Sequence, residues 1–282
     1  MSDTANAAQI DYWNATAGHI WAQFQRQLDR QISPLGREAM RVLAPKAGER
    51  ILDIGCGCGQ TTLELAAHAG PSGAVTGADI SMPMLDVARS RALPPESAQA
   101  VFLETDAQST EFGEGVFDAA FSRFGVMFFS NPVEAFGNIR KSLKPGGRFC
   151  FVCWRPFQEN PWMRAPLEAA AAFLPPSPPV DPTAPGPFAF ADARRLRGIL
   201  TDAGFRDISI DPFDSLIGGG DIEESLNLAL RIGPLGNALR ENPQFITEAE
   251  VAIRPVLLRH LTPQGVLMPA SVWIVLARAE ME

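Results

Sequence analysis

The sequence predicts an α/β fold: a doubly wound, mostly parallel sheet of seven strands with helical covering segments. Two observations lead to this prediction. Between residues 49 and 154, short apolar runs alternate with segments of helical spacing, which is typical of parallel strands joined by helices that cover both faces of the sheet. Two further strand patterns follow after residue 204. The crossovers between parallel strands are expected to be right-handed.

Each expected strand is a short apolar run bounded by turn residues or acids. The strands are predicted at Glu49–Asp53, Ala74–Ala78, Val101–Leu103, Val116–Ser122, Arg148–Trp154, Phe205–Ile217 and Val266–Ala277. The helices between them begin and end at residues that favour helix termini. They are predicted at Thr61–Ala69, after the capping residue Ser81 with Pro83 in the first turn, at Asn131–Leu143 and at Asp192–Gly204. The residues Lys144-Pro145-Gly146-Gly147 are expected to end the third helix, and Gly218-Gly219-Gly220 the sixth strand.

Three segments fall outside the alternating pattern and are expected to cover the sheet. Residues 1–45 have helical spacing and predict an N-terminal lid. Residues 155–190 are rich in proline and predict an irregular insertion that forms a cap. Residues 191–282 complete the sheet, and they contain a helical insertion at 221–262. The remaining residues, 46–154, form the expected α/β core.

Composition and charge exclude several classes of function. The chain has 24 Lys plus Arg against 32 Asp plus Glu, and the net charge of −8 disfavours a nucleic-acid partner. We find no apolar run of the roughly 20 residues that cross a bilayer, and no secretory signal, so we expect no integral membrane segment.

The four cysteines form two close pairs, Cys56 with Cys58 and Cys150 with Cys153. In a chain without a secretory signal, this pattern favours reduced thiols and a cytoplasmic location. A zinc site is rejected, because Cys150 and Cys153 lie three apart on a predicted strand and so face opposite sides. No metal is expected.

A glycine-rich turn joins the first predicted strand to the first helix, with the sequence Leu52-Asp53-Ile54-Gly55-Cys56-Gly57-Cys58-Gly59. In an open parallel sheet, ligands bind at the carboxyl ends of the strands, where this turn lies. The dinucleotide fingerprint requires a third glycine at position 60, which is Gln60, and this argues against the alternative of an NAD-dependent oxidoreductase. Asp53 would repel a pyrophosphate and suits a positively charged ligand.

Two further acids follow predicted strands. Asp79 is placed to accept hydrogen bonds from both hydroxyls of a ribose. Asp106 is placed to accept from the exocyclic amine of adenine, while the backbone N–H of Ala107 donates to the ring. Together with Asp53 and the glycine turn, these acids predict a site for an adenosine that carries a cationic, amino-acid-like tail.

At this point the chain resembles the class I S-adenosylmethionine (SAM)-dependent methyltransferases, and is most similar to the small-molecule branch with ubiquinone/menaquinone-type C-methyltransferases. The resemblance covers about residues 48–154. It rests on five motifs in the family's order: Leu52-Asp-Ile-Gly-Cys-Gly-Cys-Gly59, Gly77-Ala-Asp-Ile-Ser81, Thr105-Asp-Ala107, Phe117-Asp-Ala-Ala-Phe-Ser122 and Leu143-Lys-Pro-Gly-Gly-Arg148. It implies a Rossmann-like methyltransferase fold, SAM as cofactor, residues 46–154 as the SAM-binding core, and an antiparallel hairpin formed by the last two strands.

The resemblance also implies a set of cofactor-binding residues. Gly55 and Gly57 would pack against the methionine part of SAM, with Asp53 near its amino group. Ser122 would offer its backbone carbonyl to that ammonium. The adenosine would be bound by Asp79 at the ribose, Ile80 and Met84 on the adenine face, and Asp106 with Ala107 at the adenine edge. Tyr12 and Trp21 are candidates for the lid over SAM.

The acceptor site is less defined, because methyl transfer from a sulfonium requires a general base only if the acceptor must lose a proton. Arg123 is a candidate to bind an acceptor carboxylate, and a structural ion pair is the alternative. Trp154 and Phe157 are candidates for an apolar pocket, or else fill the core. His19 and His260 are weak candidates for a base, whereas His68 is expected at the surface.

The predicted function is therefore methyl transfer from SAM to a small-molecule acceptor, for which a lipid or quinone-like compound remains open. A non-catalytic SAM-binding protein is the second alternative. The oligomeric state is open, with a homodimer among the expectations.

Overall fold

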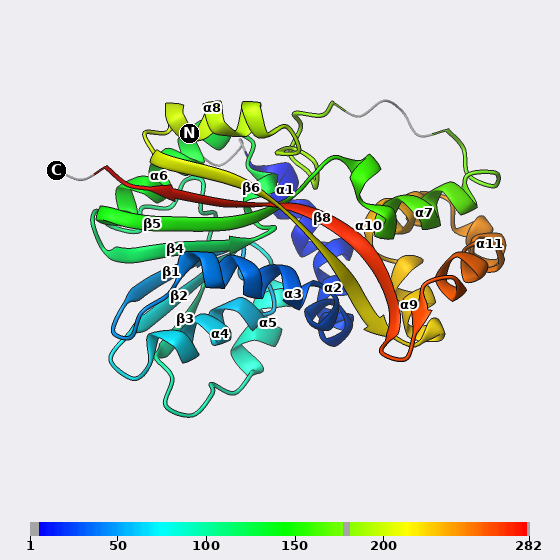
Figure 1. Ribbon diagram of the computed structural model, residues 1–282, viewed down its shortest axis with the longest axis horizontal. Helices are drawn as coiled ribbons and strands as arrows, with labels where there is room; N and C mark the ends of the chain where they lie inside the picture. Colours follow the sequence, from blue (N-terminus) through cyan, green and yellow to red (C-terminus); the bar gives the residue numbers. More distant parts are fainter. Residues whose placement is uncertain (1–5, 177–180, 281–282) are drawn as a thin grey trace.

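The computed structural model describes residues 6–176 and 181–280, and its sheet confirms the expected α/β fold. The strands follow the order β3-β2-β1-β4-β5-β8-β6, with the two-residue strand β7 paired to β8 (Figure 1). The first five strands pair in parallel, while β8 runs antiparallel to both β5 and β6. Their bounds are β1 Arg50–Ile54, β2 Ala74–Asp79, β3 Gln99–Glu104, β4 Phe117–Arg123, β5 Leu143–Trp154, β6 Arg206–Gly220, β7 Leu261–Thr262 and β8 Gly265–Arg278.

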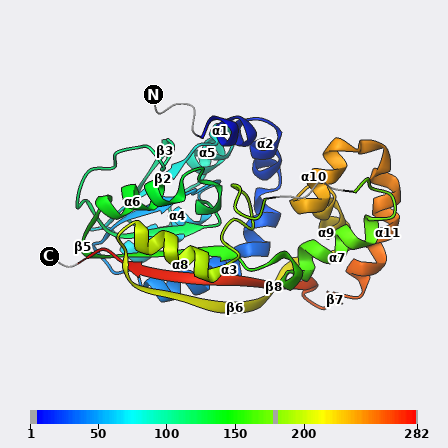
Figure 2. The same ribbon diagram turned by 90° about the horizontal axis from the view of Figure 1, so that it is seen from above.

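Helices cover both faces of the sheet, as the alternating pattern predicts (Figures 1 and 2). One face carries α3 (Gln25–Leu43), α4 (Gln60–Ala69) and α5 (Met82–Ser90), and the other carries α6 (Pro132–Ser142) and α8 (Ala193–Asp202). Asn131 and Asp192 cap α6 and α8 by accepting hydrogen bonds from backbone N–H groups of the first turn. Between the layers lie fully buried rings, among them Phe121, Phe136 and Phe149.

The cysteines lie in this core, each buried as a free thiol. The Sγ of Cys150 lies 3.3 Å from the carbonyl oxygen of Ala39 on α3, whereas that of Cys153 faces the carbonyl of Phe190 on the other side of the sheet. The two thiols therefore point to opposite faces, as expected from their spacing. Among the described residues no cluster of three His, Cys, Asp or Glu is placed to hold a metal ion.

The expected N-terminal lid, whose residues 1–5 lie outside the described residues, comprises α1 (Ala7–Asn14), α2 (Thr16–Gln23) and α3; α3 packs on a face of the sheet, and only α1 and α2 lie across the carboxyl ends of the parallel strands (Figure 1). Asn14 anchors them: its Nδ2 donates to the carbonyl of Ile80 at 2.7 Å, and its Oδ1 accepts from the N–H of Met82. Ser81 occupies the capping position of α5, but its hydroxyl donates to the carbonyl of Trp13 instead of capping the helix. The expectation that Ser81 caps by its side chain was therefore wrong.

The cap differs in part from the expected irregular insertion. Residues 155–190, of which 177–180 lie outside the described residues, contain the 3₁₀-helix η2 (Phe157–Glu159) and the helix α7 (Pro161–Ala170). The predicted helical insertion forms α9 (Ile222–Ala229), α10 (Gly233–Glu241), η3 (Pro243–Phe245) and α11 (Ile246–Leu258). These helices pack with α7 around a second small core (Figure 2), and the cap from here on means α7 together with residues 221–262. Pro161 opens α7 at a position where no backbone N–H is needed, whereas Pro166 lies inside the helix, which continues to Ala170.

Two strand limits also differ from the sequence prediction. β5 begins at Leu143, which pairs with Phe117, and the next pair is Arg148 with Ala119, so residues 144–147 form a bulge inside the strand and not a separate turn. β6 continues through the glycines expected to end it, with a register shift between Gly218 and Gly220.

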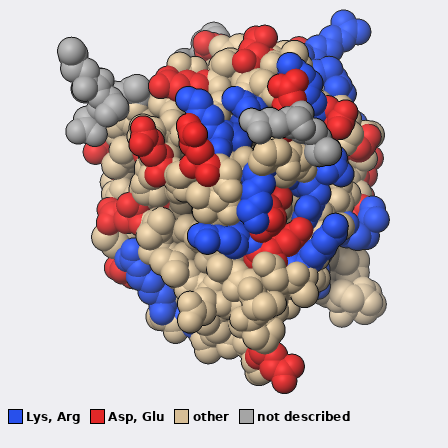
Figure 3. All heavy atoms as spheres, turned by 90° about the vertical axis from the view of Figure 1, so that its left-hand side faces the viewer, with Lys and Arg blue, Asp and Glu red and all other residues tan. Residues whose placement is uncertain are grey.

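The end of the molecule farthest from the cap carries both signs of charge. Figure 3 shows Lys and Arg side chains interspersed with Asp and Glu on this face. Some of them pair at the start of the strands, as Arg148 does with Glu49 and Lys144 with Asp118. Within the described residues no helix combines the length and apolar character needed to cross a membrane.

Candidate functional site

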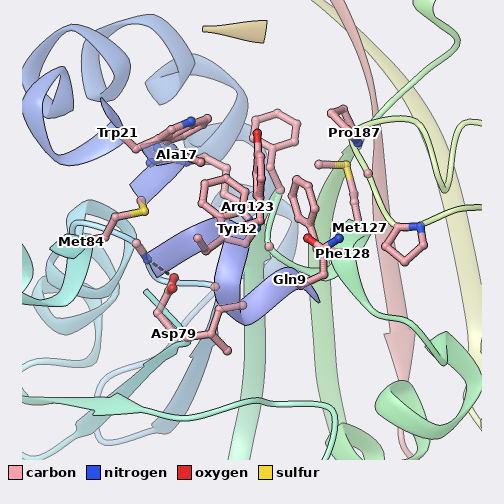
Figure 4. A pocket seen from close by; sticks show the side chains of 18 of the residues that line it. Gln9, Tyr12, Ala17, Trp21, Asp79, Met84, Arg123, Met127, Phe128 and Pro187 are labelled. Atoms are coloured by element: carbon pink, nitrogen blue, oxygen red, sulfur yellow. Dashed lines mark hydrogen bonds between the residues drawn. The ribbon is translucent and has the colours of Figure 1, made fainter. Parts of the chain in front are cut away.

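A cavity of about 380 Å³ opens at the carboxyl ends of the parallel strands. The lid covers it from one side, and the cap contributes to its far wall. Figure 4 shows side chains from α1, α2, the sheet and the segment after β4 turned toward this space, among them Tyr12, Asp79 and Phe128. The cavity therefore lies where ligands bind in open α/β sheets.

The glycine turn forms the floor of the cavity. Gly55 and Gly57 adopt positive φ angles of 65° and 53°, which residues with a side chain rarely adopt. A Cβ atom on Gly55 would lie 2.5 Å from the Cα of Gly125, and one on Gly57 would lie 2.7 Å from the Cε of Met84. The bare backbone is thus required both for the turn and for the space above it.

Asp79 lies at the end of β2, with its carboxylate at the wall of the cavity. Its Oδ2 accepts a 2.7 Å hydrogen bond from the N–H of Gly57, which Figure 4 marks, and its Oδ1 accepts one from the N–H of Ser81. Burial raises the pKa of Asp79, while these N–H donors oppose the shift. Each oxygen keeps a further lone pair for a hydroxyl donor, as ribose recognition requires.

Asp106 lies beyond β3, next to Ala107, and both line the cavity. Its Oδ1 accepts from the N–H of Gln108 and its Oδ2 from the Nδ2 of Asn6, at 3.1 Å. Asn6 is itself buried, and its Oδ1 has no partner among the described residues. No local pattern pointed to Asn6, because 100 residues separate it from Asp106.

Two predicted contacts of the methionine part are not at the cavity. Asp53 is fully buried, and its Oδ2 accepts from the hydroxyls of Thr61 and Thr62 on α4. Burial raises its pKa to about 6, against the lowering effect of those hydroxyls. Ser122 is also fully buried, and its hydroxyl donates to the carbonyl of Ile54. Both side chains point into the sheet packing and support the turn from below, so the carboxylate of Asp53 has no direct contact with the cavity, while the contact expected from the backbone carbonyl of Ser122 stays a prediction.

Arg123 lies beside the glycine turn and lines the cavity, although its side chain is only 10% exposed. One Nη donates to the Oε1 of Gln60 at 2.7 Å, and the other lies 4.0 Å from the carboxylate of Asp29. Burial lowers the pKa of Arg123, and Asp29 counteracts this. Both Asp29 and Arg123 also line a smaller adjoining cavity with Gly55 and Gly57. The other carboxylate oxygen of Asp29 accepts from Arg91 at 2.8 Å, so one anion lies between two cations beside the glycine turn.

The apolar part of the cavity lies beyond β4 and β5. Phe124 has a positive φ of 66° and stacks on Trp154, with ring centroids 4.1 Å apart. A bulky residue in this conformation is strained, which is typical of functional sites. Trp162 and Met163 of α7 line the same region. Phe157 does not line the cavity, because its ring packs against Phe188 instead.

The histidines are placed away from the cavity. His19 is exposed on α2 and His260 follows α11, and neither lines the cavity. The expectation that one of them is a base has no support in this geometry, while His68 is exposed as predicted. Sequence reasoning missed three cap residues that also line the cavity, Arg231, Asn237 and Arg240.

Together, the strand-end acids and the glycine turn form a site suited to an adenosine-containing cofactor. Residues 51–147 match the family model described as a methyltransferase domain. The chain is 38% identical over 120 residues to a demethylmenaquinone methyltransferase of Thermus thermophilus, across 43% of this chain and 54% of that one. It is 31% identical over 220 residues to the O-methyltransferase cnsE of Penicillium expansum, across 76% of this chain and 72% of that protein.

A solved structure has a similar fold. It is phosphoethanolamine N-methyltransferase 2 of Haemonchus contortus in complex with S-adenosyl-L-methionine, with a TM-score of 0.58, 18% identity, and coverage of 96% of this chain and 60% of that one. The chain belongs to the class I SAM-dependent methyltransferases. Its cofactor is SAM, and the residues at the cavity fit this group: the glycine floor leaves room for it, and the acids and Arg123 offer acceptors and a cation.

Proposed function

We propose that this chain transfers the methyl group of SAM to a small, largely apolar acceptor. The observation that carries the proposal is that one cavity joins the adenosine-type acids to an apolar end formed by Phe124, Trp154 and Trp162. A cofactor at the glycine turn and an acceptor at the apolar end would then meet in a space that the lid shields from water.

We propose a role for each cofactor residue that lines the adenosine end of the cavity. Asp79 accepts from the ribose hydroxyls, and Asp106 with Ala107 binds the adenine edge. Ile80 and Met84 pack on the adenine, and Tyr12 and Trp21 cover the cofactor from the lid. Asn6, which holds Asp106, adds a second amide at the adenine.

At the other end of the cofactor, SAM carries an ammonium and a carboxylate together with its reactive methyl group. We assign Asp29 to the ammonium and Arg123 to the carboxylate, because the two lie beside Gly55 and Gly57. This replaces the expectation that Arg123 binds the acceptor. Asp53 and Ser122 hold the turn and β4 in place.

The chain's contribution at the acceptor is positioning rather than proton transfer. Among the described residues that line the cavity there is no histidine, cysteine or lysine, and the lining carboxylates, Asp79 and Asp106, lie at the adenosine end. We therefore expect an acceptor whose nucleophilic atom ionises by itself or carries a free electron pair. The quinone-like compounds that the sequence left open meet this condition when reduced to phenols.

Location and assembly remain proposals. The four buried free thiols favour a reducing compartment, for which we propose the cytoplasm. A homodimer stays a prediction, to be checked by light scattering.

The experiment is a calorimetric titration with SAM, with NADH as the control ligand, on protein freed of S-adenosylhomocysteine. We expect micromolar binding of SAM and none of NADH.

Gly57→Val should abolish SAM binding by filling the floor of the cavity. The matched control Gly198→Val, at an exposed site of α8 with no atom near its Cβ position, should leave SAM binding intact. Release of S-adenosylhomocysteine with 1-naphthol or a hydroquinone then tests transfer. Binding without release from any phenol would favour a non-catalytic SAM-binding protein.

A further inference from the structure

Two arginines of the cap line the cavity, on the wall opposite the sheet. Arg231 follows α9, and Arg240 lies in the last turn of α10. Within residues 6–176 and 181–280, neither guanidinium lies within 4.0 Å of a carboxylate. Arg254 on the neighbouring α11 behaves differently, since it pairs with both Glu223 and Glu250. The cap therefore neutralises a cation on its outer surface and leaves the two cations at the cavity unneutralised.

Neutral groups hold the two side chains in position. The Nη1 of Arg240 donates to the carbonyl of Arg231 at 2.9 Å, and its Nη2 donates to the side-chain oxygen of Asn237. Arg231 donates to the side-chain oxygen of Asn227, and its guanidinium lies 5.8 Å from the ring centroid of Phe24. Carbonyl and amide oxygens orient a guanidinium without cancelling its charge, so both cations keep N–H groups and charge for an anion.

The net negative charge of the protein makes these two cations significant for anion binding. With a net charge of −8, the chain repels anions on average, so an anion needs a local cationic site to enter. Arg231 and Arg240 provide one beside the apolar wall that Trp162 and Met163 contribute to the same cavity.

We propose that the methyl acceptor is an apolar molecule with an anionic group, a carboxylate or a phosphate, which Arg231 and Arg240 bind. The inference rests on the proposed function, because it assigns to the acceptor the part of the cavity that the cofactor does not need. Guanidinium groups bind both anions through pairs of N–H donors, whereas the aromatic wall binds the apolar part.

The two arginines are not needed for the carboxylate of SAM. That group has its own cation in Arg123, which lies at the glycine turn on the sheet side of the cavity. Arg231 and Arg240 belong to the cap, which lies beyond the carboxyl ends of the parallel strands and is joined to the sheet by β6 and β8 (Figure 2). The adjoining small cavity at the turn includes Arg123 and neither of the cap arginines.

The test measures binding of defined probes to the full chain saturated with S-adenosylhomocysteine. The probes are 1-hydroxy-2-naphthoic acid, its neutral amide, and 1-naphthyl phosphate beside 1-naphthol. We expect the wild type to bind at least one anionic probe about ten-fold or more tightly than its neutral counterpart. The comparison of the naphthoic acid with its amide tests a carboxylate, and that of naphthyl phosphate with naphthol tests a phosphate. Arg231→Gln with Arg240→Gln should weaken anion binding by about ten- to a hundred-fold and change the neutral probes less than two-fold.

Two further variants serve as controls. Arg259→Gln removes an exposed cation from the end of α11 away from the cavity and should change nothing. Arg240→Lys keeps the charge and should retain most of the preference. Equal binding of anionic and neutral probes to the wild type would overturn the proposal, as would a double variant with unchanged anion affinity.

The cofactor is titrated first, so that a failure of the proposed function can be distinguished from a failure of the proposal about the acceptor. Weaker binding of S-adenosylhomocysteine to the double variant would assign the arginines to the cofactor and overturn the proposal. If the wild type bound neither SAM nor S-adenosylhomocysteine, the proposed function itself would fail before any probe was added.

Discussion

Gly55 and Gly125 meet backbone against backbone at the floor of the cavity. A Cβ atom on Gly125 would lie 2.7 Å from the Cα of Gly55 and equally close to the carbonyl oxygen of Ile54. This contact joins the glycine turn after β1 to the segment after β4, which carries Phe124 into the cavity. The position of the acceptor wall relative to the cofactor therefore depends on the absence of two side chains.

Gly125→Ala is expected to separate these two segments. Because both neighbours are backbone atoms, neither can move aside cheaply, and we expect a loss of about 2 to 4 kcal/mol in unfolding free energy together with weaker SAM binding. Urea unfolding and calorimetry measure the two effects. The matched change Gly137→Ala in α6, whose nearest atom would be 4.0 Å away, should be neutral or stabilising by about 0.5 to 1 kcal/mol. Equal stability of the two variants would contradict the close contact.

Asp79→Asn is expected to weaken SAM binding by about ten-fold or more, since an amide presents one acceptor where the carboxylate presents two to Gly57, Ser81 and the ribose. Titration of the folded variant with SAM measures this effect. Asp118→Asn serves as a control, because Asp118 accepts from Lys144 and the N–H of Arg50 at the opposite ends of the strands. An Asp79→Asn protein with the affinity of the wild type would rule out the ribose role.

Asp53 should make stability fall with rising pH. Its pKa is raised from an ordinary 3.8 to about 6 by burial, so between these values the folded state holds a proton that the unfolded chain has released. The unfolding free energy therefore decreases as the pH rises through this window, by at most about 3 kcal/mol, and levels off above it.

The measurement for Asp53 compares urea unfolding of the wild type and Asp53→Asn from pH 4 to pH 8. The difference in unfolding free energy, wild type minus variant, should decline up to about pH 6 and stay constant above pH 7. Asp79, whose pKa is also raised, contributes a slope of the same sign to both proteins, and because its charge raises the pKa of Asp53 the difference reports Asp53 together with this coupling. A difference that does not change with pH would show that Asp53 is ionised throughout.

Gly18→Ala is expected to displace α2 from the start of α5 and so to loosen the lid. A Cβ atom at Gly18 would lie 1.9 Å from the carbonyl oxygen of Trp13 and 2.5 Å from the hydroxyl oxygen of Ser81, where α2 contacts the start of α5. We expect weaker SAM binding and faster proteolysis near residues 6–24, with little change in the sheet core. Limited proteolysis with and without SAM checks this prediction; an unchanged cleavage rate would argue against it.

His19→Ala and His260→Ala are expected to leave methyl transfer within about two-fold of the wild type, because neither imidazole lines the cavity. The pH profile of the transfer should then follow the ionisation of the acceptor used. A loss of more than ten-fold in either variant, with SAM binding intact, would restore a histidine base.

The strands of the parallel sheet and the placement of Asp79 and Asp106 could be predicted because they depend on short-range patterns. An acid that ends a parallel strand is brought to the carboxyl edge by the strand itself. Asp53 could not be judged in the same way, because it precedes the last residue of β1 and its side chain turns toward Thr61 and Thr62. Arg123 was left between two interpretations because Asp29, the acid near it, lies 94 positions earlier in the chain.

Local patterns were enough to predict the class of fold, the cofactor turn and the strand-end acids, since glycine conformation and strand alternation act over a few residues. How the site is completed depends on the folded arrangement of the whole chain. Asn6 reaches Asp106, Phe124 stacks on Trp154, and Arg231 and Arg240 come to the cavity through the packing of the cap. These contacts join segments far apart in the chain, and their geometry follows from which surfaces the whole molecule buries together rather than from any local pattern.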